Sequence, residues 1–183
     1  MSKDLINRVE KSNLISIDLE DYFLSGKRYQ IDLKNWLADE LYLKEKEFRV
    51  AVKNHDWKKY QDCFVAINCS SKAIMPPWAY MLISTELTTY AKKTVIGNLV
   101  DLERKIFEDE IQKIDLTQYK DKSVIIKGCS NNKIPMSIYY SLSSRLLTVT
   151  KSIMYGEACS SVPVFKKRAS QFQDIESHYM EIL

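Results

Sequence analysis

The side chains best suited to chemistry in this sequence are three of its four cysteines. Cys69 and Cys129 each follow a short apolar run and precede a polar loop that leads to a proline. Cys159 follows a third apolar run by a few residues, in the sequence Gly-Glu-Ala-Cys-Ser. Thiolates bind soft metals and act as nucleophiles, so these positions favour metal binding or thiol chemistry.

The apolar runs are expected to be parallel strands, whose carboxyl ends share one edge of a sheet. We therefore expect the three sulfurs to converge there, with a carboxylate completing the ligand set: Cys69, Cys129, Cys159 and Glu157. Such a set is suited to zinc or an iron–sulfur cluster. The spacing is not diagnostic, because the sequence has no Cys-x-x-Cys pair and its two histidines have no ligand-like context.

Other interpretations of the same loops stay open. A single thiolate at Cys69 or Cys129, activated by the following helix, would serve sulfur transfer. The polar residues beside the cysteines would instead bind an anion, and these candidate ligand-binding residues are Ser70, Asn98, Ser130 and Asn131. Equally, such residues cap helices, and a cysteine after a strand is often a small buried apolar residue.

Composition and charge exclude several classes of function. The formal net charge is only +3, from 27 basic and 24 acidic residues that are interspersed, which argues against a nucleic-acid partner. No apolar stretch is long enough to cross a membrane, and no secretory signal is recognisable, so we expect a cytoplasmic protein with reduced cysteines. The sequence also lacks the glycine-rich nucleotide motifs and the Gly-x-Ser-x-Gly motif, so an enzyme is the less favoured expectation.

The elements that must position these residues alternate along the chain. Short apolar runs at 64–67, 94–96, 124–126 and 152–155 predict buried strands, and the segments 76–90, 99–114 and 135–147 between them have helical length. This alternation is typical of parallel βαβ units. Before them, period-two patterning around Ser25-Gly26-Lys27 predicts an antiparallel hairpin, followed by a surface helix at about 38–54.

The two cysteine-bearing regions resemble each other. An offset of 59 residues (119 − 60) aligns Tyr60 with Tyr119, and a one-residue insertion then aligns Cys69-Ser70 with Cys129-Ser130. Further identities follow after the cysteines, namely Pro76 with Pro135, Tyr80 with Tyr139 and Gly97 with Gly156. The repeated pattern predicts an internal duplication.

The predicted fold is therefore α/β, with a mainly parallel sheet made from two duplicated βαβ units, an N-terminal antiparallel hairpin and flanking helices. Residues 1–183 form a single domain in this prediction. Its parts are the hairpin and helix at 1–59, the first copy at 60–98, the second copy at 119–157, and a helical tail at 165–183, in which Phe172, Ile175, Tyr179 and Ile182 have helical spacing.

Several longer motifs resemble a known family. They are Asp18-Leu19-Glu20-Asp21-Tyr22, Pro77-Trp78-Ala79-Tyr80-Met81, Val124–Ser130, Ser152–Ser160 and Pro163. Together they resemble the bacterial domain-of-unknown-function family numbered 2480, over nearly the whole chain up to Lys167. The resemblance assigns no activity and no catalytic residue, but it implies an association with iron–sulfur assembly proteins.

Two functional hypotheses follow from the sequence. The first is an accessory protein whose thiolates bind a metal or handle sulfur during iron–sulfur cluster maturation. The second is a non-catalytic interaction protein with inert, buried cysteines. Its surface, including Phe172 and Tyr179 of the tail, docks a partner or a second copy in a homodimer.

Overall fold

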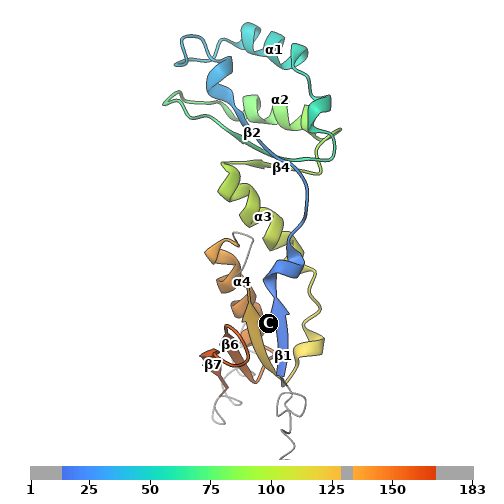
Figure 1. Ribbon diagram of the computed structural model, residues 1–183. Coiled ribbons are helices and arrows are strands. Elements are labelled where there is room, and N and C mark those ends of the chain that lie inside the picture. The colour runs from blue at the N-terminus through green and yellow to red at the C-terminus, as the bar shows by residue number, and fades with distance from the viewer. Residues whose placement is uncertain (1–13, 129–133, 168–183) are drawn as a thin grey trace, which may run out of the picture. The chain divides into compact units, whose positions relative to one another are not determined.

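The computed structural model describes residues 14–128 and 134–167, and the chain forms two compact units. One unit is a single stretch, residues 24–110, which we call the continuous unit; the other combines residues 1–23 and 111–183, and we call it the discontinuous unit. Figure 1 shows the elements of both. No helix of the described residues is long and apolar enough to cross a membrane.

The continuous unit is built on a three-stranded parallel sheet. Its strands lie in the order β2 (Arg28–Asp32), β3 (Phe64–Asn68) and β4 (Lys93–Ile96). Residues 64–67 of β3 are fully apolar and all buried, as expected for a strand covered on both faces.

Three helices cover this sheet. Val65 and Ile67 of β3 belong to the apolar cluster formed with α1 (Glu45–Asn54) and α2 (Pro77–Leu87). Phe64 and Ala66 alternate with them and belong to a second cluster, formed with α3 (Leu99–Gln112). The alternation of side chains along β3 therefore supplies both layers of the core.

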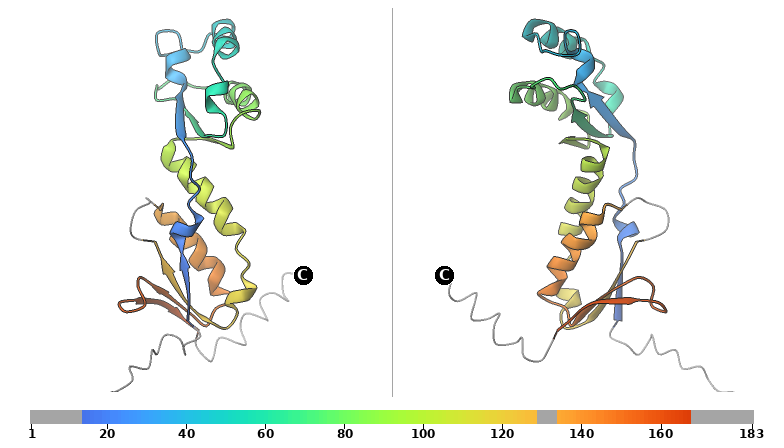
Figure 2. Two further views of the ribbon diagram at one scale, coloured as in Figure 1. Left: turned by 45° about the vertical axis from the view of Figure 1, so that its right-hand side comes forward. Right: turned by 90° about the vertical axis from the view of Figure 1, so that its left-hand side faces the viewer.

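The discontinuous unit is built on a four-stranded sheet. Its strands lie in the order β1 (Leu14–Asp18), β5 (Ser123–Lys127), β6 (Ser152–Tyr155) and β7 (Val162–Lys166), and only β7 is antiparallel to its neighbour. Helix α4 (Met136–Leu147) lies along one face, as Figure 2 shows, and buries Ile138, Leu142 and Leu146 at intervals of four residues.

The mixed α/β architecture with mainly parallel strands is confirmed, but the strands form two sheets rather than one. The N-terminal hairpin prediction is wrong in its pairing: β1 pairs with β5 and β2 pairs with β3, both in parallel. The physical reason lies at the strand ends. Asp18 accepts a backbone hydrogen bond that starts a short 3-10 helix (Leu19–Tyr22), so β1 does not run into a tight hairpin turn before β2. Asp32 starts a second 3-10 helix (Leu33–Trp36) at the other end of β2.

Two boundaries also differ from the prediction. The helix expected at about 38–54 begins only at Glu45, because Asp39 and Glu40 have positive φ angles and Ala38 forms a β-bridge with Tyr42. The predicted tail at 165–183 overlaps strand β7, which includes Phe165 and Lys166. Residues 168–183 lie outside the described part of the chain.

Candidate functional site

The predicted cysteine ligands fall in different parts of the structure. Cys69 directly follows β3 in the continuous unit, is half-buried, and packs against the core cluster of that unit. Cys159 lies in the discontinuous unit and is exposed. Cys129 lies outside the described residues. The argument from one shared sheet edge therefore fails for Cys69, whose strand belongs to the other sheet.

Strands β5 and β6 share one sheet edge. They are parallel neighbours, with Ile126 opposite Tyr155, so their carboxyl ends lie at the same edge of the sheet. At that edge the Lys127 ammonium lies 2.7 Å from the Glu157 carboxylate. The hydrogen bond to Glu157 raises the pKa of Lys127, and the charges of Asp18 and Cys159 add to this effect.

Two of the predicted ligand-binding residues make hydrogen bonds within their own unit. The Ser70 hydroxyl donates to the Asp32 carboxylate over 2.6 Å, and the Ser70 backbone N–H donates to the same side chain over 3.0 Å. The Asn98 carboxamide oxygen accepts the N–H groups of Val100 and Asp101, which caps the start of α3. Ser130 and Asn131 lie outside the described residues.

A metal site is not assembled in the part of the chain that the structure describes. Across residues 14–128 and 134–167, no group of three or more His, Cys, Asp or Glu side chains is arranged to hold an ion. Cys159 and Glu157 supply two donors near one sheet edge, and Glu157 is already engaged by Lys127. The four-ligand site with Cys129 stays a prediction.

A different feature of the discontinuous unit was missed by the sequence reasoning: an open apolar groove of about 430 Å³ between α4 and the strands β5, β6 and β7. We call it the α4 groove. The residues that line it are Ile126, Met136, Tyr139, Tyr140, Ser143, Ile153, Met154, Tyr155 and Val164. All of them belong to one unit, so the groove is defined by that unit alone.

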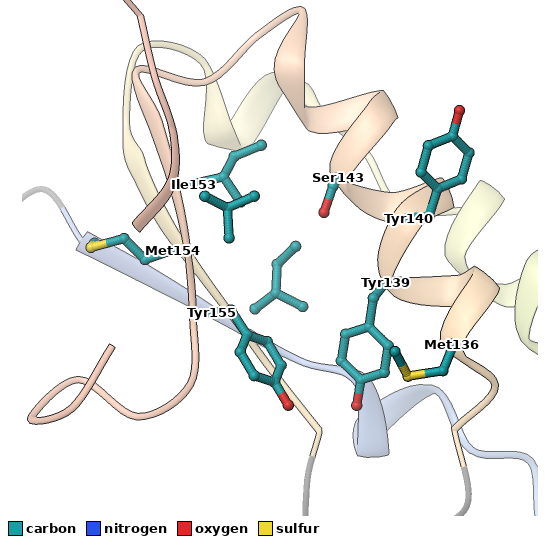
Figure 3. Close-up of a pocket in the computed structure, with 9 residues that line it drawn as sticks. Met136, Tyr139, Tyr140, Ser143, Ile153, Met154 and Tyr155 are labelled. Carbon is teal, nitrogen blue, oxygen red and sulfur yellow. The ribbon is translucent and has the colours of Figure 1, made fainter. Parts of the chain in front are cut away.

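The polar groups of the α4 groove are few. Tyr139 and Tyr155 meet edge to face with ring centroids 5.7 Å apart, and Figure 3 shows their hydroxyls on the same side. The Tyr139 hydroxyl donates a short hydrogen bond to the carbonyl oxygen of Gly128. Ser143 contributes a third hydroxyl from the next turns of α4. An apolar surface with a few fixed polar groups is typical of a binding site.

The α4 groove exposes large apolar side chains to water. Met136 is 83% exposed, Tyr140 is 75% exposed and Val164 is 59% exposed. A signal for this surface was available in the sequence. After the buried stripe of Ile138, Leu142 and Leu146, helix α4 still carries Met136 and Tyr140 four residues apart, a second apolar stripe that its own sheet does not bury.

Comparison with known proteins gives one match. Residues 3–167 match the model of a family described as "Protein of unknown function (DUF2480)". No curated protein and no solved structure matches the chain. The match covers every described element, including all residues that line the α4 groove.

Proposed function

The chain belongs to the DUF2480 family of proteins of unknown function, and we propose that it is a non-catalytic interaction protein. In this proposal it binds an apolar segment of another protein in the α4 groove. The observation that carries this proposal is the exposure of Met136, Tyr140 and Val164 around one groove. Contiguous exposed apolar surface of this kind marks interaction sites in soluble proteins.

The size of the groove fits side chains of a protein segment. A cavity of about 150 Å³ accommodates one benzene ring, so about 430 Å³ holds roughly three groups of that size. Burying the exposed apolar area contributes about 25 cal/mol per Å². The hydroxyls of Tyr139, Tyr155 and Ser143 would fix the orientation of the backbone or a polar side chain of the bound segment.

Methionine methyl NMR tests this proposal in the full chain. Two of the six methionines, Met136 and Met154, line the groove, whereas Met75 and Met81 belong to the continuous unit. The probe is the neutral apolar dye N-phenyl-1-naphthylamine. We expect it to shift the methyl signals of Met136 and Met154 and to leave those of Met75 and Met81 in place. Equal shifts at all four, or none at Met136 and Met154, would refute the proposal.

A second candidate function keeps the sequence hypothesis of a thiolate site. The proposal is that Cys129 and Cys159, with Glu157, bind zinc or an iron–sulfur cluster, or carry sulfur for iron–sulfur assembly proteins. It is supported by the parallel pairing of β5 with β6, because the carboxyl ends of both strands lie at one edge of the sheet and Cys159 follows β6 by four residues.

Elemental analysis of protein purified without oxygen or chelators tests the thiolate site. The proposal predicts near-stoichiometric zinc or iron in the parent chain and its loss in Cys129→Ser. The matched control is Cys63→Ser, because the buried Cys63 thiol donates to the carbonyl oxygen of Gln61 and is no part of the predicted site. Equal metal content in all three chains, or no metal in any, would remove this candidate.

We also propose that the two units descend from one duplicated βαβ unit. Matching details support this. Asp62 and Asp121 precede β3 and β5 with φ angles of 58° and 57°. Gly97 and Gly156 follow β4 and β6, and each donates its N–H to the neighbouring strand, to Ile67 and Ile126 respectively. Such backbone details are shared by related copies more readily than by unrelated ones.

A further inference from the structure

Strand β7 runs from the α4 groove toward the start of β6. The backbone N–H of Lys167 donates to the carbonyl oxygen of Lys151 over 2.9 Å, at the start of β6. Val164, which lines the groove, precedes Lys167 by three residues, or about 10 Å of strand. The described chain therefore ends about 10 Å along the strand from a residue of the groove, a distance that three or four extended residues span.

The sequence of that segment matches an apolar groove. Phe172, Ile175, Tyr179 and Ile182 follow one another at intervals of three, four and three residues, which places them on one face of a helix. From Phe172 to Ile182 a helix rises about 15 Å, and the part of α4 that lines the groove, Met136 to Ser143, rises about 10 Å. The apolar face is long enough to cover the groove.

The charges of the two parts are complementary. The segment 168–183 carries three acidic residues, Asp174, Glu176 and Glu181, and one basic residue, Arg168, at its start. At the end of the sheet where the chain leaves it, the exposed residues Lys151 and Lys166 are basic. Opposite charges at the exposed rim contribute little affinity but favour one orientation of the docked segment.

We infer that residues 168–183 dock as an amphipathic helix in the α4 groove of the same chain, so that an external partner must displace them. This inference rests on the proposed function of the groove and adds a regulatory element to it. The short connection to β7 gives the segment an effective concentration in the millimolar range, so even a weak contact is populated. The residues that line the groove lie within the family match, which ends at residue 167, whereas the segment 168–183 follows that end.

A matched pair of full-length variants tests this inference. Tyr179→Asp places a charge on the apolar face of the segment, and Ser177→Asp places the same charge on the opposite face. We expect Tyr179→Asp to shift the methyl signals of Met136 and Met154 in the free chain and to bind N-phenyl-1-naphthylamine about tenfold more tightly than the parent. Ser177→Asp should match the parent in both respects, at every protein concentration.

The alternative outcomes separate the inference from the proposal on which it rests. If Tyr179→Asp leaves Met136 and Met154 unchanged while the dye still binds at these methyls, the groove is a binding site but the segment does not cover it, and the inference is wrong. Methyl shifts that depend on protein concentration would show that the segment docks into a second copy of the chain. That result would also overturn the inference. Absence of dye binding at these methyls in all three chains would refute the proposed function itself.

Discussion

Asp32 organises the loop that follows β3, although the sequence reasoning assigned that loop to ligand binding through Ser70. Its carboxylate accepts the N–H of Lys34 and both the N–H and the hydroxyl of Ser70. Partial burial raises the pKa of Asp32, but the hydrogen bonds from Ser70 and Lys34 outweigh it and hold the pKa below its ordinary value of 3.8. The charged form is therefore the one that the fold stabilises.

Replacing Asp32 should weaken the continuous unit in a pH-dependent way. For Asp32→Ala we expect the free energy of unfolding to fall by about 1–2 kcal/mol at pH 7, from the lost cap and the lost hydrogen bonds. A depressed folded-state pKa means that this stabilisation is complete above the unfolded-state pKa and is lost as the pH falls through the folded-state value. The difference between the two chains should therefore shrink below about pH 4.

The readout for this prediction is specific to one unit. Trp36, Trp57 and Trp78, which are all the tryptophans of the chain, lie in the continuous unit, so urea unfolding followed by tryptophan fluorescence reports on it. Asp56→Ala is the control, because Asp56 is exposed and outside the helices and strands. If the free energy of unfolding of Asp32→Ala stays below that of the parent by a constant amount down to pH 2, the role assigned to the charge of Asp32 is contradicted.

At the scale of elements, α4 explains why the groove exists. One stripe of the helix packs on its sheet, while Met136 and Tyr140 face away from that contact. The end of the helix is fixed by Arg145, whose guanidinium donates to the carbonyl oxygens of Ile111, Gln112 and Ile114. These hydrogen bonds attach the C-terminal end of α4, which is the end away from Met136, to the chain at the end of α3.

The ends of β4 and β6 provide a paired test of backbone constraint. Gly97 and Gly156 have φ angles of +143° and +109°, which side chains rarely tolerate. An added Cβ would lie 2.6 Å from the Asp101 carboxylate at Gly97 and 3.3 Å from the Ser160 carbonyl oxygen at Gly156. We expect Gly97→Ala and Gly156→Ala each to lower the free energy of unfolding by about 1–3 kcal/mol.

Urea unfolding followed by circular dichroism tests both glycine variants, because the signal reports on the secondary structure of both units. The controls are Lys92→Ala and Lys151→Ala, at the opposite ends of the same strands, because each keeps the backbone N–H that donates to Cys63 or Lys122. These controls should stay within about 0.5 kcal/mol of the parent. Tolerance of alanine at either glycine would mean that the constraint is not shared by the two units.

At the scale of the whole molecule, the sequence predicts elements better than it predicts their partners. The runs of β3, β5 and β6 are short, apolar and bounded by turn residues, so local pattern was enough to find them. Which strand pairs with which depends on contacts between distant residues, such as Leu14 with Ser123. For this reason the predictions of a hairpin and of a single sheet were wrong, although most helices and strands were predicted to within a few residues.

The site could be predicted only in part for a related reason. A search for reactive side chains finds cysteines, but helix capping accounts for Asn98, and a carboxylate of its own unit engages Ser70. The α4 groove has no reactive group to signal it, and β7 was missed because Pro163 and the exposed valines at 162 and 164 do not form a buried strand pattern. The second apolar stripe of Met136 and Tyr140 is visible in the sequence, but only the fold shows that it is left uncovered.

The most direct test of the α4 groove as a binding site is the affinity of N-phenyl-1-naphthylamine for two matched variants, made in the full-length Tyr179→Asp chain. Val164→Glu changes a valine of the groove that is 59% exposed, and Val50→Glu changes a valine on α1 that is 58% exposed. We predict at least about tenfold weaker binding, or about 1.4 kcal/mol, for Val164→Glu alone. Equal affinity of the two variants would contradict the account.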